Sequence, residues 1–148
     1  MDLLEYQGKQ LFARHGVPVP SGSPADTVEK AVAAAEQIGY PCVIKAQVQI
    51  GGRGKAGGIK VAENRDEATE HAEAILGMEI RGPRGEGPFT VHEVWVERAS
   101  EIDSEYYASI ILDRSEKKLL AMLSTMGGMT VEEIAEKDPD ALVRRYMD

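Results

Sequence analysis

Apolar residues recur at spacings of three and four along three stretches of the chain, which predicts helices at residues 3–14, 28–38 and 66–76. In the first of these, Leu4, Leu11 and Phe12 fall on one side. A fourth, short helix is expected around 131–136. The Val-Pro-Val-Pro run at 17–20 predicts an extended crossing, because proline fixes φ and disfavours helix in the preceding residue.

Shorter apolar runs bounded by glycine, proline and polar residues predict strands at 41–48, 59–62, 90–97, 105–112 and 118–124. The polar residues 113–116 are typical of a turn, so the last two strands are expected to form a hairpin. The glycine- and proline-rich stretch 81–88 is expected to be a loop. The order gives neighbouring antiparallel strands without steady βαβα alternation. The predicted fold class is therefore α+β.

Composition excludes several classes of protein. The 148 residues carry 17 Lys+Arg against 25 Asp+Glu, a net charge of −8, which argues against a surface built for nucleic acid or anionic lipid. A hydrophobic content of 43% argues against disorder. The single cysteine, Cys42, excludes an internal disulfide and a Cys-rich metal site. No signal or transit pattern opens the sequence, so a cytoplasmic location is expected.

The strongest chemical signal is the window KAQVQIGGRGKAGGIK at 45–60. It holds Lys45, Arg53, Lys55 and Lys60, no acidic residue, and five glycines in positions 51–58. Glycines allow positive φ and close approach of backbone N–H groups, which can form a concavity for an anion. Cations that lack acidic partners would add charge-assisted hydrogen bonds to phosphate. The alternative is a flexible hairpin tip whose charges only solubilise it.

The window matches no common phosphate loop completely. A Walker loop needs a hydroxyl residue after its lysine, and Ala56 follows Lys55. Gly52, Gly54 and Gly57 fit GxGxxG, but a Rossmann loop opens a helix, and here a strand is predicted to follow. A strand–glycine loop–strand is the arrangement that protein kinases place over ATP phosphates, although their lysine follows the loop. What remains is a glycine flap over nucleotide phosphates with a lysine on the strand before it.

Four segments carry a family resemblance: LEYQGKQLFARHGVPVP, VIKAQVQIGGRGKAGGIKV, the VERA…EYY…DRS run and STMGGM. Together they resemble the amino-terminal part of succinyl-CoA synthetase β subunits, which are ATP-grasp ligases. The resemblance covers essentially the whole chain. It implies the amino-terminal portion of an ATP-grasp fold, a mixed or antiparallel sheet with packed helices, in a chain that stops short of the family's length.

The resemblance also assigns nucleotide-binding residues. It implies that Lys45 contacts phosphate from its strand and that Gly52, Arg53 and Gly54 form the flap over the nucleotide. Further contacts fall on three more positions, Glu97 and Ser100 near the base and ribose, and Glu105 in SEYY.

Two single positions refine the resemblance. Pro20 resembles ATP-preferring rather than GTP-preferring members, whereas Met126 stands where a glutamate is frequent, which puts a polar role there in doubt.

In such a family the reaction joins succinate and CoA at the cost of a nucleoside triphosphate, through succinyl phosphate and a phosphohistidine on a partner α subunit. The implied ligands are ATP, with GTP possible, and Mg²⁺ whose ligands lie beyond residue 148. No catalytic residue or metal ligand is expected in this segment. Residues 1–20 are expected to belong to the second grasp subdomain, 21–105 to form the nucleotide-binding lid, and 106–148 to begin the second subdomain.

Two other interpretations stay open. The same grasp can serve another acid, such as malate or citrate in CoA ligation, because acid-binding residues are not in this segment. The chain can also be an isolated, non-catalytic lid domain. If the family assignment holds, 148 residues alone are expected to bind nucleotide weakly and to show no ligase turnover.

Overall fold

The computed structural model describes residues 2–129 and 131–147. They form two compact units, Met1–Ser100 and Glu101–Asp148. None of the helices in the described residues combines the length and apolar character that crossing a membrane requires.

The first unit is built on a four-stranded antiparallel sheet with the order β1-β6-β2-β3. Its strands are β1 (Gly22–Ala25), β2 (Cys42–Ala46), β3 (Ile59–Ala62) and β6 (Val94–Arg98). A separate two-stranded ribbon pairs β4 (Glu79–Ile80) with β5 (Phe89–Thr90). The glycine- and proline-rich loop predicted at 81–88 joins these two short strands.

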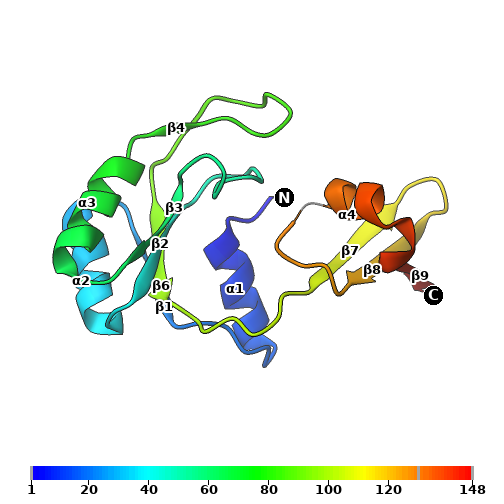
Figure 1. The fold of residues 1–148 in the computed structure, drawn as a ribbon, viewed down its shortest axis with the longest axis horizontal. Coiled ribbons are helices and arrows are strands. Elements are labelled where there is room, and N and C mark those ends of the chain that lie inside the picture. The colour runs from blue at the N-terminus through cyan, green and yellow to red at the C-terminus, as the bar shows by residue number, and fades with distance from the viewer. Residues whose placement is uncertain (1, 130, 148) are drawn as a thin grey trace. The chain divides into compact units, whose positions relative to one another are not determined.

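Three helices accompany the sheet, α1 (Glu5–Arg14), α2 (Val28–Ile38) and α3 (Arg65–Ile75). Figure 1 shows α2 and α3 together on one face of the sheet and α1 on the other. Small residues of α2 and α3, among them Ala31, Ala35, Ala68 and Ala72, are fully buried and let the helices pack closely on the sheet. The side chain of Thr27 caps the first turn of α2, and that of Asn64 caps the first turn of α3.

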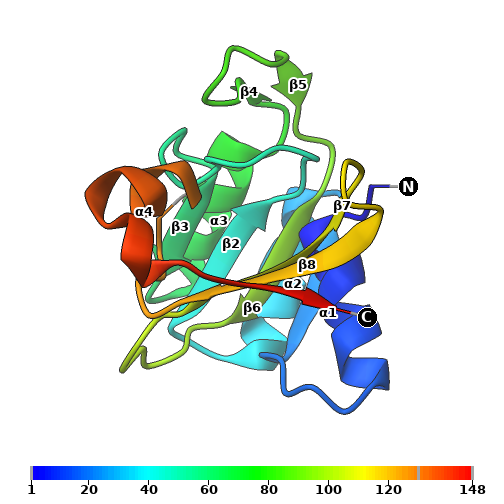
Figure 2. The same ribbon diagram turned by 90° about the vertical axis from the view of Figure 1, so that its right-hand side faces the viewer.

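The second unit is a three-stranded antiparallel sheet with the order β7-β8-β9. The strands are β7 (Tyr107–Asp113), β8 (Lys118–Ser124) and β9 (Val143–Met147), seen edge to edge in Figure 2. Helix α4 (Val131–Lys137) and a 3₁₀ turn, η1 (Pro139–Ala141), lead into β9. Met122, Ile134 and Leu142 form the core of this unit.

The α+β class and the 113–116 hairpin turn are confirmed, whereas one predicted strand is wrong and two strands were not predicted. The strand expected at 90–97 is two strands, because the chain leaves the β4–β5 ribbon after Thr90 and joins the main sheet only at Val94. Strand β1 lies at 22–25 and was not expected; its proline is tolerated because β1 is an edge strand. Strand β9 was not expected either. Leu11 and Phe12, which the sequence places on one side of α1, are exposed.

Candidate nucleotide site

The strand register places Lys45 and Glu97 on the same face of the first sheet. Lys45 lies opposite Trp95 in the β2–β6 pair, and Glu97 lies opposite Val43. Because directly opposed residues point to the same side, these residues share the face turned away from α2 and α3. Val43, Lys45, Ile59, Val61, Trp95 and Glu97 are called here the charged face.

Glu97 is a buried carboxylate with three donors around it. The whole Glu97 residue is only 4% exposed. Lys45 Nζ contacts Oε1, Lys9 Nζ contacts Oε2, and the Trp95 indole N–H donates to Oε2 at 2.7 Å. Burial by itself would raise the pKa of Glu97, but the hydrogen bonds from Lys45, Lys9 and Trp95 outweigh it and hold the pKa below its usual value. Glu97 is therefore a fixed negative charge.

Glu5, in the first turn of α1, links the cations of the glycine window. Its Oε1 lies 2.9 Å from Lys9 Nζ and 3.3 Å from Lys45 Nζ, and its Oε2 lies 2.7 Å from Arg53 Nη2. Burial opposes ionisation of Glu5, yet the hydrogen bond from Lys9 and the charges of Lys45 and Arg53 lower its pKa from 4.5 to about 2. One carboxylate thus holds a strand lysine and a loop arginine at a common point.

Arg53 is fixed from both ends of its guanidinium group. Nη1 donates to the Ala46 carbonyl at the end of β2, at 2.8 Å, while Nη2 faces Glu5. The expectation that the cations of this window lack acidic partners is therefore wrong for Lys45 and Arg53. Their partners, Glu5 and Glu97, lie far from the window in sequence and reach it only through the tertiary fold.

The glycine loop between β2 and β3 is a set of tight turns. The amides of Ala56, Gly57 and Gly58 donate to the carbonyls of Gly52, Gly54 and Arg53. A phosphate cradle built by this loop therefore has to use amides ahead of Ala56. The strand–loop–strand arrangement is confirmed, since β3 pairs antiparallel with β2.

Only some of the glycines serve backbone conformation. Gly52 and Gly57 have φ of 76° and 81°, a region that side chains strongly disfavour. Gly58 is required for packing instead, because a Cβ there would lie 2.8 Å from Ile80 and 3.0 Å from Ala46. A Cβ at Gly54 would meet only Ile59, at 3.8 Å.

Sequence reasoning missed Glu5 and Lys9 as site residues. Both lie in the LEYQGKQ segment, one helical turn apart, so they face the same side of α1 and pair with each other. Burial alone would lower the pKa of Lys9, but its hydrogen bonds to Glu97 and Glu5 raise it. Between them Tyr6 stacks on Trp95, with ring centroids 5.6 Å apart and planes 11° apart. The signal in the sequence that could have indicated Glu5 and Lys9 is their spacing, an acidic and a basic residue four positions apart.

The other predicted nucleotide contacts lie outside this cluster. Ser100 is exposed, just after β6, at the end of the first unit. Glu105 belongs to the second unit, where its carbonyl accepts from the Gly127 amide at 3.1 Å. A Cβ at Gly128 would lie 2.5 Å from Glu105 Oε2, so the Gly-Gly pair of STMGGM makes room for this carboxylate. The position of Met126 is partly buried beside the core of the same unit.

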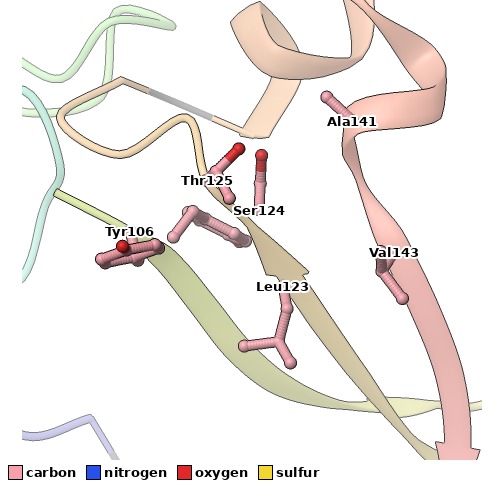
Figure 3. A pocket seen from close by; sticks show the side chains of 7 residues that line it. Tyr106, Leu123, Ser124, Thr125, Ala141 and Val143 are labelled. Carbon is pink, nitrogen blue, oxygen red and sulfur yellow. The ribbon is translucent and has the colours of Figure 1, made fainter. Parts of the chain in front are cut away.

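A pocket of about 440 Å³ opens at the end of β8 in the second unit. Figure 3 shows the hydroxyl groups of Ser124 and Thr125 on one side and Leu123 pointing the opposite way, with Tyr106 and Val143 on the flanks. The lining is mainly apolar, and it carries no charged side chain among its described residues. Within residues 2–129 and 131–147, no three His, Cys, Asp or Glu side chains gather in a way that would hold a metal ion.

Comparison with protein families gives a match over nearly the whole chain. Residues 2–148 match the model of an ATP-grasp domain. The chain is 53% identical over 148 residues to the succinate–CoA ligase [ADP-forming] subunit β of Natronomonas pharaonis, and 51% identical over 148 residues to that of Haloarcula marismortui. Each alignment covers 100% of this chain and 37% of the relative. The chain therefore spans well under half the length of these curated relatives, and the resemblance expected from its motifs is confirmed.

Solved structures agree on the fold. The chain superimposes with a TM-score of 0.76 and 23% identity on a dinucleotide-forming acetyl-coenzyme A synthetase 1 from Ca. Korarchaeum cryptofilum, solved with coenzyme A and Ca-AMPCP. The match covers 97% of this chain and 59% of that structure. At this identity the likeness supports the arrangement of strands and helices.

Proposed function

Because the chain belongs to the ATP-grasp family, we propose that it is the nucleotide-binding part of a succinate–CoA ligase β subunit. The proposed reaction couples hydrolysis of ATP, or of GTP, to reversible formation of succinyl-CoA. Relatives with that printed name align with every residue of this chain, which favours succinate over other acids.

The convergence of Lys45 and Arg53 is the single observation that carries the nucleotide assignment. These two cations come from a strand and from the loop after it, and both meet the two oxygens of one carboxylate. Two cations aimed at one bidentate anion are the arrangement that a phosphate group requires. In phosphoryl transfer such positioning and charge neutralisation supply most of the catalysis.

The remaining roles follow from the chemistry of each residue and stay proposals. Gly52 and Gly54 flank Arg53 and let the flap approach the phosphates. Glu97 and Glu105 supply carboxylates that accept hydrogen bonds from ribose hydroxyls or an exocyclic amine. The hydroxyl of Ser100, exposed at the end of the first unit, adds a base contact.

The whole reaction needs groups that this segment does not supply. We propose that an α subunit binds CoA and carries the phosphohistidine, that succinyl phosphate is the intermediate, and that Mg²⁺ is held by residues outside this chain. The described residues offer no cluster that fits a metal ion, so no step is assigned to one here. Pro20 favours ATP over GTP, and the proposed location is the cytoplasm.

The proposed subdomains remain those expected from the resemblance: 1–20 with the second grasp subdomain, 21–105 as the lid, and 106–148 as the start of the second subdomain.

An activity assay on the natural full-length protein, with any partner subunit that copurifies, tests this function. We expect CoA-dependent ADP formation with succinate, strongly reduced in Lys45→Ala. Lys60→Ala is the matched control, because Lys60 lies opposite Ile44 on the helix-covered face. Activity with malate or citrate but not succinate would replace the proposed acid. No turnover with any acid, together with nucleotide binding that Lys45→Ala leaves unchanged, would favour a non-catalytic module.

A further inference from the structure

The residues proposed to bind nucleotide already have an intramolecular anion. Glu5 of α1 contacts Lys45 at 3.3 Å and Arg53 at 2.7 Å, the two cations assigned to phosphate. Lys9, one turn further along the same helix, contacts Glu97, the carboxylate assigned to the base and ribose. A single short helix therefore engages three of the nucleotide contacts at once.

We propose that Glu5 stands in for a phosphate group and that nucleotide binding exchanges it for phosphate oxygens, with α1 withdrawing from the charged face. This inference rests on the proposed nucleotide function and adds to it a residue that sets affinity. If Glu5 stayed, its carboxylate would lie against the incoming phosphates, and like charges at such range repel. Glu5 thus competes with nucleotide phosphate for Lys45 and Arg53.

The attachment of α1 suits such an exchange. All ten residues of α1 are described, and none of them is buried. The helix is held by its ion pairs, by the stacking of Tyr6 on Trp95, and by the Tyr6 amide, which donates to Gln47 Oε1 at 3.2 Å. Withdrawal uncovers one large apolar side chain, the Trp95 ring, which is 4% exposed and stacks on Tyr6. The new contacts of Lys45 and Arg53 with phosphate have to offset that cost.

The connection from α1 to the sheet also permits movement. Residues 11–18 are exposed, and Gly16 follows the helix with φ of 76° and open space around it. The helix itself is short. A ten-residue helix is marginal in water once its tertiary contacts are gone, so withdrawal should loosen its backbone hydrogen bonds.

Withdrawal would also free Glu97 for its proposed contact. In the structure both of its oxygens are engaged, Oε1 by Lys45 and Oε2 by Lys9 and Trp95. Removal of Lys9 with α1 leaves Oε2 with only the indole donor, which opens an acceptor position to a ribose hydroxyl or an amine. The exchange therefore prepares the phosphate and the ribose contacts together.

Calorimetric titration of Mg-ATP into the natural full-length protein tests the exchange. We expect Glu5→Gln, which keeps the shape but removes the charge, to bind ATP about tenfold more tightly than wild type. Glu70→Gln, an exposed charge change on α3, is the control and should bind as wild type does. Lys45→Ala should bind more weakly. If Glu5→Gln binds ATP as wild type does or more weakly, while Lys45→Ala is still impaired, the proposed replacement of Glu5 is wrong but the nucleotide function stands.

Amide hydrogen exchange measured on the wild-type protein is a second test, and it does not depend on whether Glu5→Gln folds normally. Saturating ATP should speed amide exchange in residues 5–14 while slowing it in the glycine loop at 51–58. If ATP protects the amides of both segments, or leaves amide exchange in residues 5–14 unchanged, the proposed replacement of Glu5 by phosphate is wrong. If ATP fails to bind wild type, or binds Lys45→Ala equally well, the proposed nucleotide function fails instead.

Discussion

The main sheet of each unit has one face packed on an apolar core, and the two sheets differ in what the other face carries. In the first unit that face bears Lys45 and Glu97, whose charges are balanced by Glu5 and Lys9 of α1. In the second unit the face turned away from the core is exposed and mainly apolar; beside Arg145, Ala108 and Ala121 it carries Ile110, Leu112, Leu119, Leu123, Val143 and Met147.

We propose that this difference separates a ligand-binding surface from a packing surface. Buried charges need partners, and an ion-pair cluster that includes cations from a strand and a loop is suited to exchange one anion for another. An apolar face has no such selectivity and gains free energy from any contact that removes it from water. We therefore propose that phosphate binding belongs to the first unit's charged face, and the following substitutions test that division.

Removal of Glu97 should have the largest effect on stability. Glu97→Ala removes the buried carboxylate that Lys9 and Lys45 share and leaves Glu5 as their remaining partner, and we expect a loss of about 3 kcal/mol in the free energy of unfolding. Urea unfolding followed by the fluorescence of Trp95, the only tryptophan of the sequence, reports on this unit. Glu70→Ala on the surface of α3 is the control; an equal loss in both variants would mean that the cluster has no special role.

Gly22 should be nearly as sensitive, because it supports the ring on the charged face. A Cβ at Gly22 would overlap the Trp95 ring and lie 2.7 Å from the Val96 carbonyl. We expect Gly22→Ala to cost about 2 kcal/mol through overpacking. Gly8→Ala is the matched control, since a Cβ there meets nothing within 4 Å and should stabilise the helix by about 0.5–1 kcal/mol. If Gly22→Ala leaves the free energy of unfolding unchanged, Trp95 is not held in place by close packing on Gly22.

The pH dependence of the first unit should be moderate and have a defined sign. The pKa of Glu5 is about 2 in the folded protein and 4.5 otherwise, so its contribution is fully present above pH 4.5 and is lost as the pH falls toward 2. Glu97, whose pKa is also lowered, acts in the same direction. We expect Glu5→Gln to lack about 1–2 kcal/mol of this acid-sensitive stability. Parallel stability curves for both proteins from pH 6 to 2.5 would contradict the ion-pair assignment.

Substitutions on the apolar face of the second unit should change the free energy of unfolding least and self-association most. Ile110 is 63% exposed, so Ile110→Ser should change the free energy of unfolding by less than about 0.5 kcal/mol. The same change should lower the binding of a hydrophobic dye and light scattering at high concentration. A large loss of stability would show that this face is packed in solution.

The sequence predicted the elements that have strong local signals. The spacing of apolar residues found α2 and α3, and the polar run at 113–116 located the β7–β8 hairpin. It could not find β1, which carries a proline and pairs with β6 far away in the chain, or β9, which carries two arginines and is separated from β8 by α4 and η1. It could not place the break at residues 91–93 either, because that break is set by the change from one sheet to another.

The sequence located the cations of the candidate site but not the carboxylates that contact them. The glycines and cations of 45–60 are local in sequence, so the window stood out from a chain of net charge −8. The carboxylate that joins Lys45 to Arg53 lies 40 residues before Lys45, and no local pattern connects the two. Lys45 and Arg53 of the basic window therefore belong to an ion-pair cluster that Glu5 and Lys9 of α1 and Glu97 of β6 complete.

The central claim is that the charged face binds nucleotide phosphate, and calorimetric titration of ATP into Lys45→Ala and Lys60→Ala tests it most directly. The two lysines lie on adjacent strands and on opposite faces of the sheet. Loss of a charge-assisted hydrogen bond predicts at least about tenfold weaker binding for Lys45→Ala, with Lys60→Ala close to wild type. Equal affinities for Lys45→Ala and wild type, or an equal loss in both variants, would contradict the claim.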